Sequence, residues 1–268
     1  MDILNELPEE KFNQVDDLLA FVSIYDDQAR LEAYRQMLNA CRDKLRGQVC
    51  LEAGAGAGVF SEWMARMGAR KVYAVEVNPL LCRLARERLA HYPNVEVIQA
   101  DIQNFKPLEP VDVLVHELFG QLLYDEDVLA LENLPFQPKT MLPARARLAC
   151  GCVPASRLVD TTVTPSVLQQ LEGVLVSGLF DEEGLALTDT VLTWQPGAVQ
   201  CSVEKDISHL SGELLYFGLE IWFNGRPICR AGECSNWSYV WTPRAGNRFA
   251  LRFEPAGRGM QVRFAWLD

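Results

Sequence analysis

The stretch QVCLEAGAGAGVFSEWMARMG, residues 48–68, decides the fold. Its first part, residues 48–53, has the length and apolar content of a buried strand. Three glycines then stand at alternate positions: Gly54, Gly56 and Gly58. From residue 59 the apolar side chains recur at helical spacing, and Gly68 is placed to end the helix. A strand, a glycine turn and a helix in this order predict a parallel sheet with helices on its faces.

The same alternation continues on both sides of this unit. Apolar strands are predicted at residues 71–77, 95–100 and 111–116, and Asn78 followed by Pro79 predicts the cap and first turn of an intervening helix. Apolar residues at helical spacing predict two helices before the first strand, one from Phe12 to Val22 and one from Leu31 to Leu45. We therefore expect an α/β fold with a Rossmann-like, doubly wound sheet.

The pattern changes near Lys139, after which most segments alternate like strands. Asn224-Gly225 is a strong two-residue hairpin signal, and a closing hairpin is predicted around Gly257 and Gly259. This half is predicted to be an antiparallel barrel or sandwich. We expect a cofactor-binding domain over residues 1–145 and a barrel-like substrate domain over residues 146–268, with a short helix or loop excursion near 160–185.

Composition limits the function. The 268 residues are 49% hydrophobic and 23% charged, which is typical of a globular protein, and no apolar run reaches the length of a membrane span. The net charge of −11 argues against nucleic acid as the main partner and is compatible with a cationic substrate. The eight cysteines form no CxxC pair and the N-terminus lacks the order of a signal peptide, so we expect a cytoplasmic protein with no metal and no membrane partner.

The loop from Glu52 to Gly58 points to a nucleotide-like ligand. A dinucleotide fingerprint would need glycine where Val59 stands, and the loop has no phosphate-binding lysine. Glu76 ends the second predicted strand, where a carboxylate can bind two ribose hydroxyls. Three residues follow the third predicted strand, where a polar group can meet an adenine: Asp101, Ile102 and Gln103. An adenosine without a diphosphate fits, and S-adenosylmethionine is the predicted cofactor. The alternative is a glycine-rich turn with unrelated polar residues at the strand ends.

Acidic residues follow the fourth predicted strand in VHELFGQLLYDED, residues 115–127. Glu117 and Glu126 stand on either side of an apolar loop at the sheet edge where the cofactor is expected. Two carboxylates in a partly apolar pocket favour a planar cation between them, and a guanidinium offers the matching fork of donors. The alternative is an exposed acidic loop in which Asp125 caps a helix over residues 126–134.

The motifs CLEAGAGAG, VYAVEVN, VHELFGQLLYDED and MLPARARL resemble, in order and spacing, the protein arginine methyltransferases. The spacing of Glu117, Gly120 and Glu126 is similar to that of the family's double-glutamate loop. ARLEAYRQML resembles a family helix, which implies that Arg30 contacts the cofactor carboxylate and that Asp27 is a supporting acid. The family histidine that pairs with this acid is replaced by Asn236, which can hydrogen-bond Asp27 but cannot take up a proton or carry a positive charge.

Other family features are reduced. The tyrosine-rich helix that covers the cofactor in the family is represented only by Tyr25, and the excursion near 160–185 is short for a dimerisation arm. His116 precedes Glu117 directly, but strand alternation points it to the opposite face, so we expect a structural role.

These observations favour an S-adenosylmethionine-dependent N-methyltransferase that acts on a guanidino group. Its substrate would be an arginine in a protein or peptide, or a small guanidino compound, and a homodimer is left open. Two alternatives stay open as well. One is a small-molecule methyltransferase with a non-guanidino acceptor, and the other is a catalytically silent binding protein with a methyltransferase-like fold.

Overall fold

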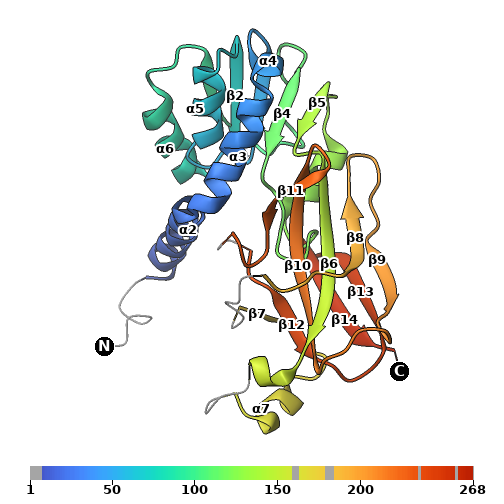
Figure 1. Cartoon of the computed structure of the whole chain (residues 1–268). Helices are drawn as coiled ribbons and strands as arrows, with labels where there is room; N and C mark the ends of the chain where they lie inside the picture. Colours follow the sequence, from blue (N-terminus) through green and yellow to red (C-terminus); the bar gives the residue numbers. More distant parts are fainter. Residues whose placement is uncertain (1–7, 159–162, 179–183, 235–236, 257–258, 268) are drawn as a thin grey trace.

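The computed structural model describes residues 8–158, 163–178, 184–234, 237–256 and 259–267. Helices and a parallel sheet form one end of the molecule, and antiparallel sheets form the other (Figure 1). The two ends share one large hydrophobic core.

Among the described residues, three helices come first. These are α2 (Glu9–Asp26), α3 (Gln28–Ala40) and α4 (Arg42–Leu45). Asp27 separates α2 from α3 because its backbone is extended, and its carboxylate caps α3 by accepting the backbone N–H of Arg30 at 2.9 Å. Helix α3 contacts both α5 and β11, so it lies against both halves of the molecule.

The parallel sheet has the strand order β3-β2-β1-β4-β5, and all its pairings are parallel. The strands are β1 (Val49–Ala53), β2 (Lys71–Glu76), β3 (Val95–Gln99), β4 (Val113–His116) and β5 (Thr140–Leu142). Two helices connect them, α5 (Val59–Arg66) and α6 (Pro79–Leu89). The predicted cap of α6 is confirmed, since Asn78 Oδ1 accepts the N–H groups of Leu80 and Leu81 at 2.9 and 3.3 Å. The Rossmann-like prediction is confirmed.

The part of the antiparallel half that the structure describes contains two sheets. One has the order β7-β12-β10-β6-β8, with β11 also paired to β10, and the other has the order β14-β13-β9. The strands are β6 (Arg145–Val153), β7 (Val176–Ser177), β8 (Asp189–Trp194), β9 (Ser202–Asp206), β10 (Leu214–Phe223), β11 (Arg226–Arg230), β12 (Val240–Pro243), β13 (Arg248–Ala256) and β14 (Gly259–Trp266). Phe217 and Phe249 pack edge to face between the sheets, with ring centroids 5.4 Å apart.

Local sequence signals explain the turns and connections of the antiparallel half. Asn224 and Gly225 form the β10–β11 turn with φ of 49° and 77°, as the dipeptide predicted. The last strand of the parallel sheet ends at Leu142 and the first antiparallel strand begins at Arg145, next to the predicted boundary at residue 145, which stays a prediction. The predicted excursion near 160–185 contains α7 (Pro165–Gln170) and β7 among its described residues, and the short helix η2 (Ala155–Arg157) precedes it.

One predicted helix differs in kind. Residues after the acidic loop form the 3-10 helix η1 (Asp127–Asn133), and Glu126 at its start makes no side-chain cap. Asp125 does not cap it either, because its carboxylate accepts the N–H of Leu122 at 2.8 Å. The helix stops before Leu134, which precedes a proline and is therefore extended.

The length and hydropathy of the helices decide whether any of them could cross a membrane. Within the described ranges, no helix has both the length and the apolar character that crossing a lipid bilayer requires.

Candidate active site

The glycine loop lies at the carboxyl end of β1. Gly54, Gly56 and Gly58 all adopt positive φ, at 66°, 52° and 78°, which L residues with side chains rarely adopt. Glu76, at the end of β2, is 5% exposed, and its two carboxylate oxygens accept the N–H groups of Gly56 and Asn78, each at 2.8 Å. The Glu76 side chain therefore holds the loop against the neighbouring strand.

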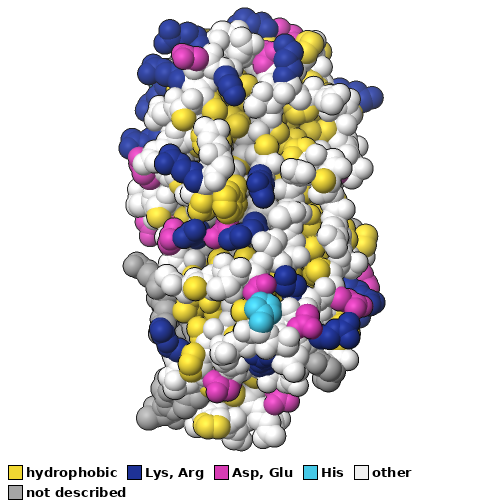
Figure 2. Space-filling model, turned by 45° about the vertical axis from the view of Figure 1, so that its right-hand side comes forward, with side chains coloured by type: hydrophobic (Ala, Val, Ile, Leu, Met, Phe, Trp, Pro, Cys, Tyr) yellow, Lys and Arg dark blue, Asp and Glu magenta, His cyan; other side chains and the backbone are white. Residues whose placement is uncertain are grey.

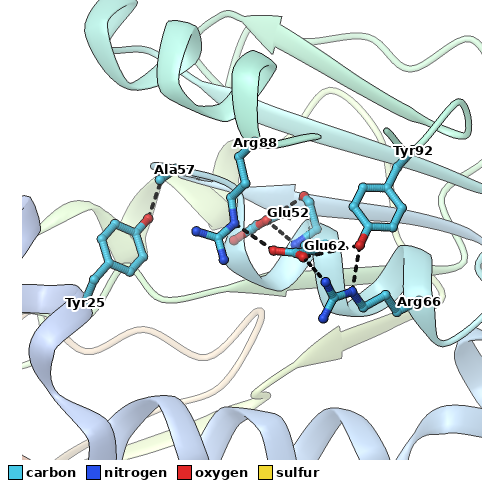
Figure 3. A network of polar contacts seen from close by, with 8 residues as sticks. Tyr25, Glu52, Ala57, Glu62, Arg66, Arg88 and Tyr92 are labelled. Atoms are coloured by element: carbon cyan, nitrogen blue, oxygen red, sulfur yellow. Dashed lines mark hydrogen bonds and ion pairs between the residues drawn. The ribbon is translucent and has the colours of Figure 1, made fainter. Parts of the chain in front are cut away.

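Glu52 lies under the same loop and faces α5. One carboxylate oxygen accepts the N–H of Ser61 at 2.6 Å and its hydroxyl at 2.5 Å. Burial raises the pKa of Glu52 to about 7, against the lowering effect of these hydrogen bonds. Figure 3 shows this contact next to an ion-pair network in which Glu62 binds Arg66 and Arg88. A cofactor contact of Glu52 stays a prediction.

Tyr25, at the end of α2, lies on the glycine loop (Figure 3). Its hydroxyl accepts the N–H of Ala57 at 2.7 Å. A side-chain carbon added to Gly56 would overlap this hydroxyl and lie 3.5 Å from the ring carbon that carries it. Burial raises the pKa of Tyr25 to about 12, and the charge of Glu52 adds to the effect. The sequence showed only that Tyr25 was present; its contact with the loop depends on the angle between α2 and α3, which has no local signal.

Arg30 joins the N-terminal helices to the acidic loop. Its side chain is 4% exposed and forms an ion pair with Glu117, which is 10% exposed. Its Nη1 donates to the carbonyl of Ile24 at 2.9 Å, and its Nε is buried without a hydrogen-bond partner among the described residues. Burial lowers the pKa of Arg30. The resemblance predicted a cofactor role for Arg30 and the loop motif predicted a substrate role for Glu117, and the structure brings these two side chains together.

The acidic loop is folded tightly on itself. Leu123 has a positive φ of 78°, and residues 120 and 123 form a β-bridge. A side-chain carbon on Gly120 would lie 2.5 Å from Cγ of Asp125 and 2.9 Å from the backbone nitrogen of Glu126, so only glycine fits at this position. The indole of Trp237 holds the loop from the antiparallel half, donating to the carbonyl of Phe119 at 3.1 Å. The loop therefore returns Glu126 toward residues near Glu117.

The carboxyl group of Glu126 is a weaker acid than that of an ordinary glutamate. The residue is solvent-exposed, yet partial withdrawal from water raises the pKa of its carboxyl to about 7, and the charges of Asp125 and Asp127 raise it further. The convergence of Glu117 and Glu126 on one guanidinium stays a prediction.

The residues after β3 lie near this loop. The charge of Asp101 raises the pKa of Asp127, after the larger effect of burial, so the two carboxylates are close. Asp101 accepts the N–H of Gln103 at 2.9 Å, and Ile102 is 8% exposed. The predicted adenine contacts of Asp101, Ile102 and Gln103 stay predictions.

Roles were also predicted for Asn236 and His116. Asn236 lies outside the described residues. His116 is fully buried, its Nε2 lies 2.9 Å from the carbonyl of Pro143, and its ring packs against Phe119 and Trp194. Burial lowers its pKa to about 4, and its fully buried position fits the predicted structural role.

Comparison with known proteins adds independent findings. Residues 50–134 match a family model described as a methyltransferase domain. The chain is 34% identical over 131 residues to protein arginine N-methyltransferase PRMT10 of Oryza sativa subsp. japonica, covering 46% of this chain and 34% of the relative. It is 32% identical over 120 residues to protein arginine N-methyltransferase 6 of Danio rerio, covering 44% and 34%. The matches thus span about one third of the length of these relatives.

Solved structures share the architecture of both halves. One is the Trypanosoma brucei PRMT1 enzyme-prozyme heterotetrameric complex with AdoHcy, with a TM-score of 0.69, 16% identity and 90% of both chains covered. Another is a crystal structure of PRMT6, with a TM-score of 0.69, 15% identity and coverage of 94% of this chain and 99% of that one. At such low identity these likenesses show the fold alone.

The fold and the family model define the class of protein: residues 50–134 form a methyltransferase domain, followed by antiparallel sheets. The curated relatives that match the chain are protein arginine N-methyltransferases, the family that the motifs resemble.

Proposed function

We propose that this protein is an S-adenosylmethionine-dependent methyltransferase that methylates the guanidino group of arginine in a protein or peptide. The observation that carries the proposal is the ion pair between Arg30 and Glu117. It joins a residue on the cofactor side to a residue on the acceptor side, so the two predicted binding functions meet at one place. The curated relatives that match the chain are arginine methyltransferases, which supports the same acceptor.

The residues present fit the proposed cofactor. Arg30 has a buried Nε that lacks a partner among the described residues, and a ligand carboxylate can accept from a guanidinium in this state. Glu76 has carboxylate oxygens that can accept hydrogen bonds from ribose hydroxyls, and the glycine loop, on which Tyr25 lies, is held against it. When bound, S-adenosylmethionine supplies an electrophilic methyl group.

The acidic loop supplies the acceptor side. Glu117 and the ionised form of Glu126 would bind a guanidinium from two sides and fix its plane. Holding the charge on two of its nitrogens leaves the third as the better nucleophile and aims it at the methyl group. Asp27 would support Arg30 by capping its helix. Asn236 would replace the family histidine as a hydrogen-bonding group.

The proposal also covers compartment and architecture. All eight cysteines are free, which suits the reducing cytoplasm. The two antiparallel sheets would form a barrel-like substrate domain. Light scattering on the purified chain would distinguish a monomer from a homodimer.

Glu117→Gln tests the proposal. The variant keeps the shape of the side chain and removes its charge, so we expect transfer from labelled S-adenosylmethionine to an arginine peptide to fall at least about 100-fold. Binding of S-adenosylhomocysteine, measured by calorimetry, should stay the same or tighten, because Arg30 loses a competitor for its guanidinium. Glu87→Gln, an exposed change of equal charge on α6, is the matched control. Full turnover by Glu117→Gln would show that the clamp is misassigned.

The acceptor is tested separately. Arginine peptides, small guanidino compounds and amine or hydroxyl nucleophiles are incubated with labelled cofactor, and products are identified by mass spectrometry. Methylation confined to non-guanidino acceptors would overturn the proposal. An absence of S-adenosylhomocysteine binding would leave the chain as a catalytically silent methyltransferase-like protein.

A further inference from the structure

A second charged site lies on the antiparallel half, across β6, β10 and β11. Two rows of side chains lie side by side on adjacent strands in the residue register. In one row Arg147 on β6 is opposite Glu220 on β10, which is opposite Arg230 on β11. In the other row Arg145 is opposite Trp222. Figure 2 shows one face of the molecule, on which Lys and Arg side chains lie beside Asp and Glu side chains across the middle.

Glu220 is the centre of the first row. It is 2% exposed although it lies on a sheet face rich in charged residues. Its carboxylate binds Arg147 through Nε at 2.7 Å and Nη2 at 2.5 Å, and it binds Nε of Arg230 at 3.2 Å. It also accepts the indole N–H of Trp222 at 3.2 Å. A buried carboxylate with this many donors fixes the positions of the side chains around it.

Trp222 is the centre of the second row. The guanidinium carbons of Arg145 and Arg147 both lie 5.4 Å from the centroid of its ring, within the range of a cation–π contact. Arg147 is neutralised by Glu220. Arg145 is exposed, and its guanidinium has no ion pair or hydrogen bond to any residue that the structure describes. Its donors are therefore oriented by the indole and free to bind an anion.

The balance of charge identifies the ligand class. The guanidinium groups of Arg147 and Arg230 share the buried carboxylate of Glu220, Arg145 has no acidic partner among the described residues, and Glu233 adds a distant contact to Arg230 at 3.8 Å. The three arginines therefore outnumber the two acids, and the site is positive in a chain of net charge −11. Arg145 is exposed and lacks an acidic partner among the described residues, and Arg230 is exposed beside Glu220, so acidic side chains of an extended segment laid across these strands can contact both.

We propose that this surface, formed by Arg145, Arg147, Glu220, Trp222 and Arg230, binds an extended acidic segment of a partner protein. An arginine-rich acceptor would be repelled here, so the site is distinct from the acidic loop that would bind the methyl acceptor. The phosphates of a nucleic acid could also meet these arginines, but the net charge of −11 opposes the approach of a polyanion at long range. A short acidic segment carries far less charge and suffers less of this repulsion.

The test uses fluorescence anisotropy with a labelled peptide in which glutamate alternates with threonine, and with its glutamine counterpart. We expect saturable binding of the glutamate peptide to the full chain, weakening as salt is raised from 50 to 300 mM. Arg145→Gln should weaken it about ten-fold, the loss expected for one charge-assisted contact. Arg83→Gln, an exposed arginine on α6, is the matched control and should leave binding unchanged.

Several results would overturn the proposal. They are equal binding of the glutamate and glutamine peptides, no saturable binding, or equal losses in the Arg145 and Arg83 variants. Tighter binding of poly(U) RNA than of the peptide, with the same dependence on Arg145, would assign the surface to nucleic acid instead. Thermal melting of each variant checks that Arg145→Gln remains folded.

Discussion

The raised pKa of Glu126 predicts how methyl transfer depends on pH. Its pKa is raised to about 7, mainly by withdrawal from water and further by the charges of Asp125 and Asp127. The proposed clamp needs Glu126 ionised, since a neutral carboxyl cannot hold a guanidinium as an ion pair. The ratio kcat/KM reports ionisations of the free enzyme, so it should rise with pH through this value.

The size of the effect follows from the ionised fraction. With a pKa of about 7, roughly one tenth of Glu126 is ionised at pH 6, half at pH 7 and nine tenths at pH 8. Between pH 6 and 8, kcat/KM for an arginine peptide should therefore increase about ten-fold. A glutamate of ordinary pKa would give a flat profile over the same range, because it is fully ionised above pH 6.

Two variants test whether Glu126 is the group that causes the pH dependence of kcat/KM. Glu126→Gln should lower kcat/KM and remove the dependence on pH. Asp127→Asn should move the rising limb to lower pH, because it removes one neighbouring charge and leaves the larger effect of desolvation in place. Transfer is measured with labelled cofactor at constant ionic strength from pH 5.5 to 8.5. A flat wild-type profile, or a limb that survives in Glu126→Gln, would refute the reasoning.

The remaining predictions concern the loops around the site. Gly120→Ala should cost about 1–3 kcal/mol of unfolding free energy and most of the transfer activity, because its new carbon would overlap Asp125; urea unfolding and the transfer assay measure both. Tyr25→Phe should cost about 1 kcal/mol locally, seen as faster hydrogen exchange of the Ala57 amide. Glu52 binds more protons in the folded than in the unfolded chain between about pH 4.5 and 7, so its contribution to stability falls as pH rises. Relative to Glu52→Gln, the wild-type free energy of unfolding should fall by on the order of 3 kcal/mol across that window, and equal pH dependence in urea would contradict this.

Much of the fold was predictable because each signal is local. The strand, glycine turn and helix of residues 48–68, the Asn78 cap and the Asn224-Gly225 turn all depend on residues that are neighbours in sequence. The helix after Glu126 was predicted less well. The apolar spacing of its residues fits both an α-helix and a 3-10 helix, and the tight loop before it removes Asp125 as a cap.

The contacts within the candidate site were harder to predict because they join separate elements. Motif spacing picked out Arg30 and Glu117 one at a time, with a ligand assigned to each. The ion pair between them follows from a physical requirement that the sequence does not express, namely that a buried guanidinium needs a nearby carboxylate. The same requirement explains Glu220, which lies on a predicted strand with no motif around it, and whose partners come from two neighbouring strands. Both buried charges are paired by side chains from elements that the sequence keeps apart, which is why neither pairing follows from a local motif.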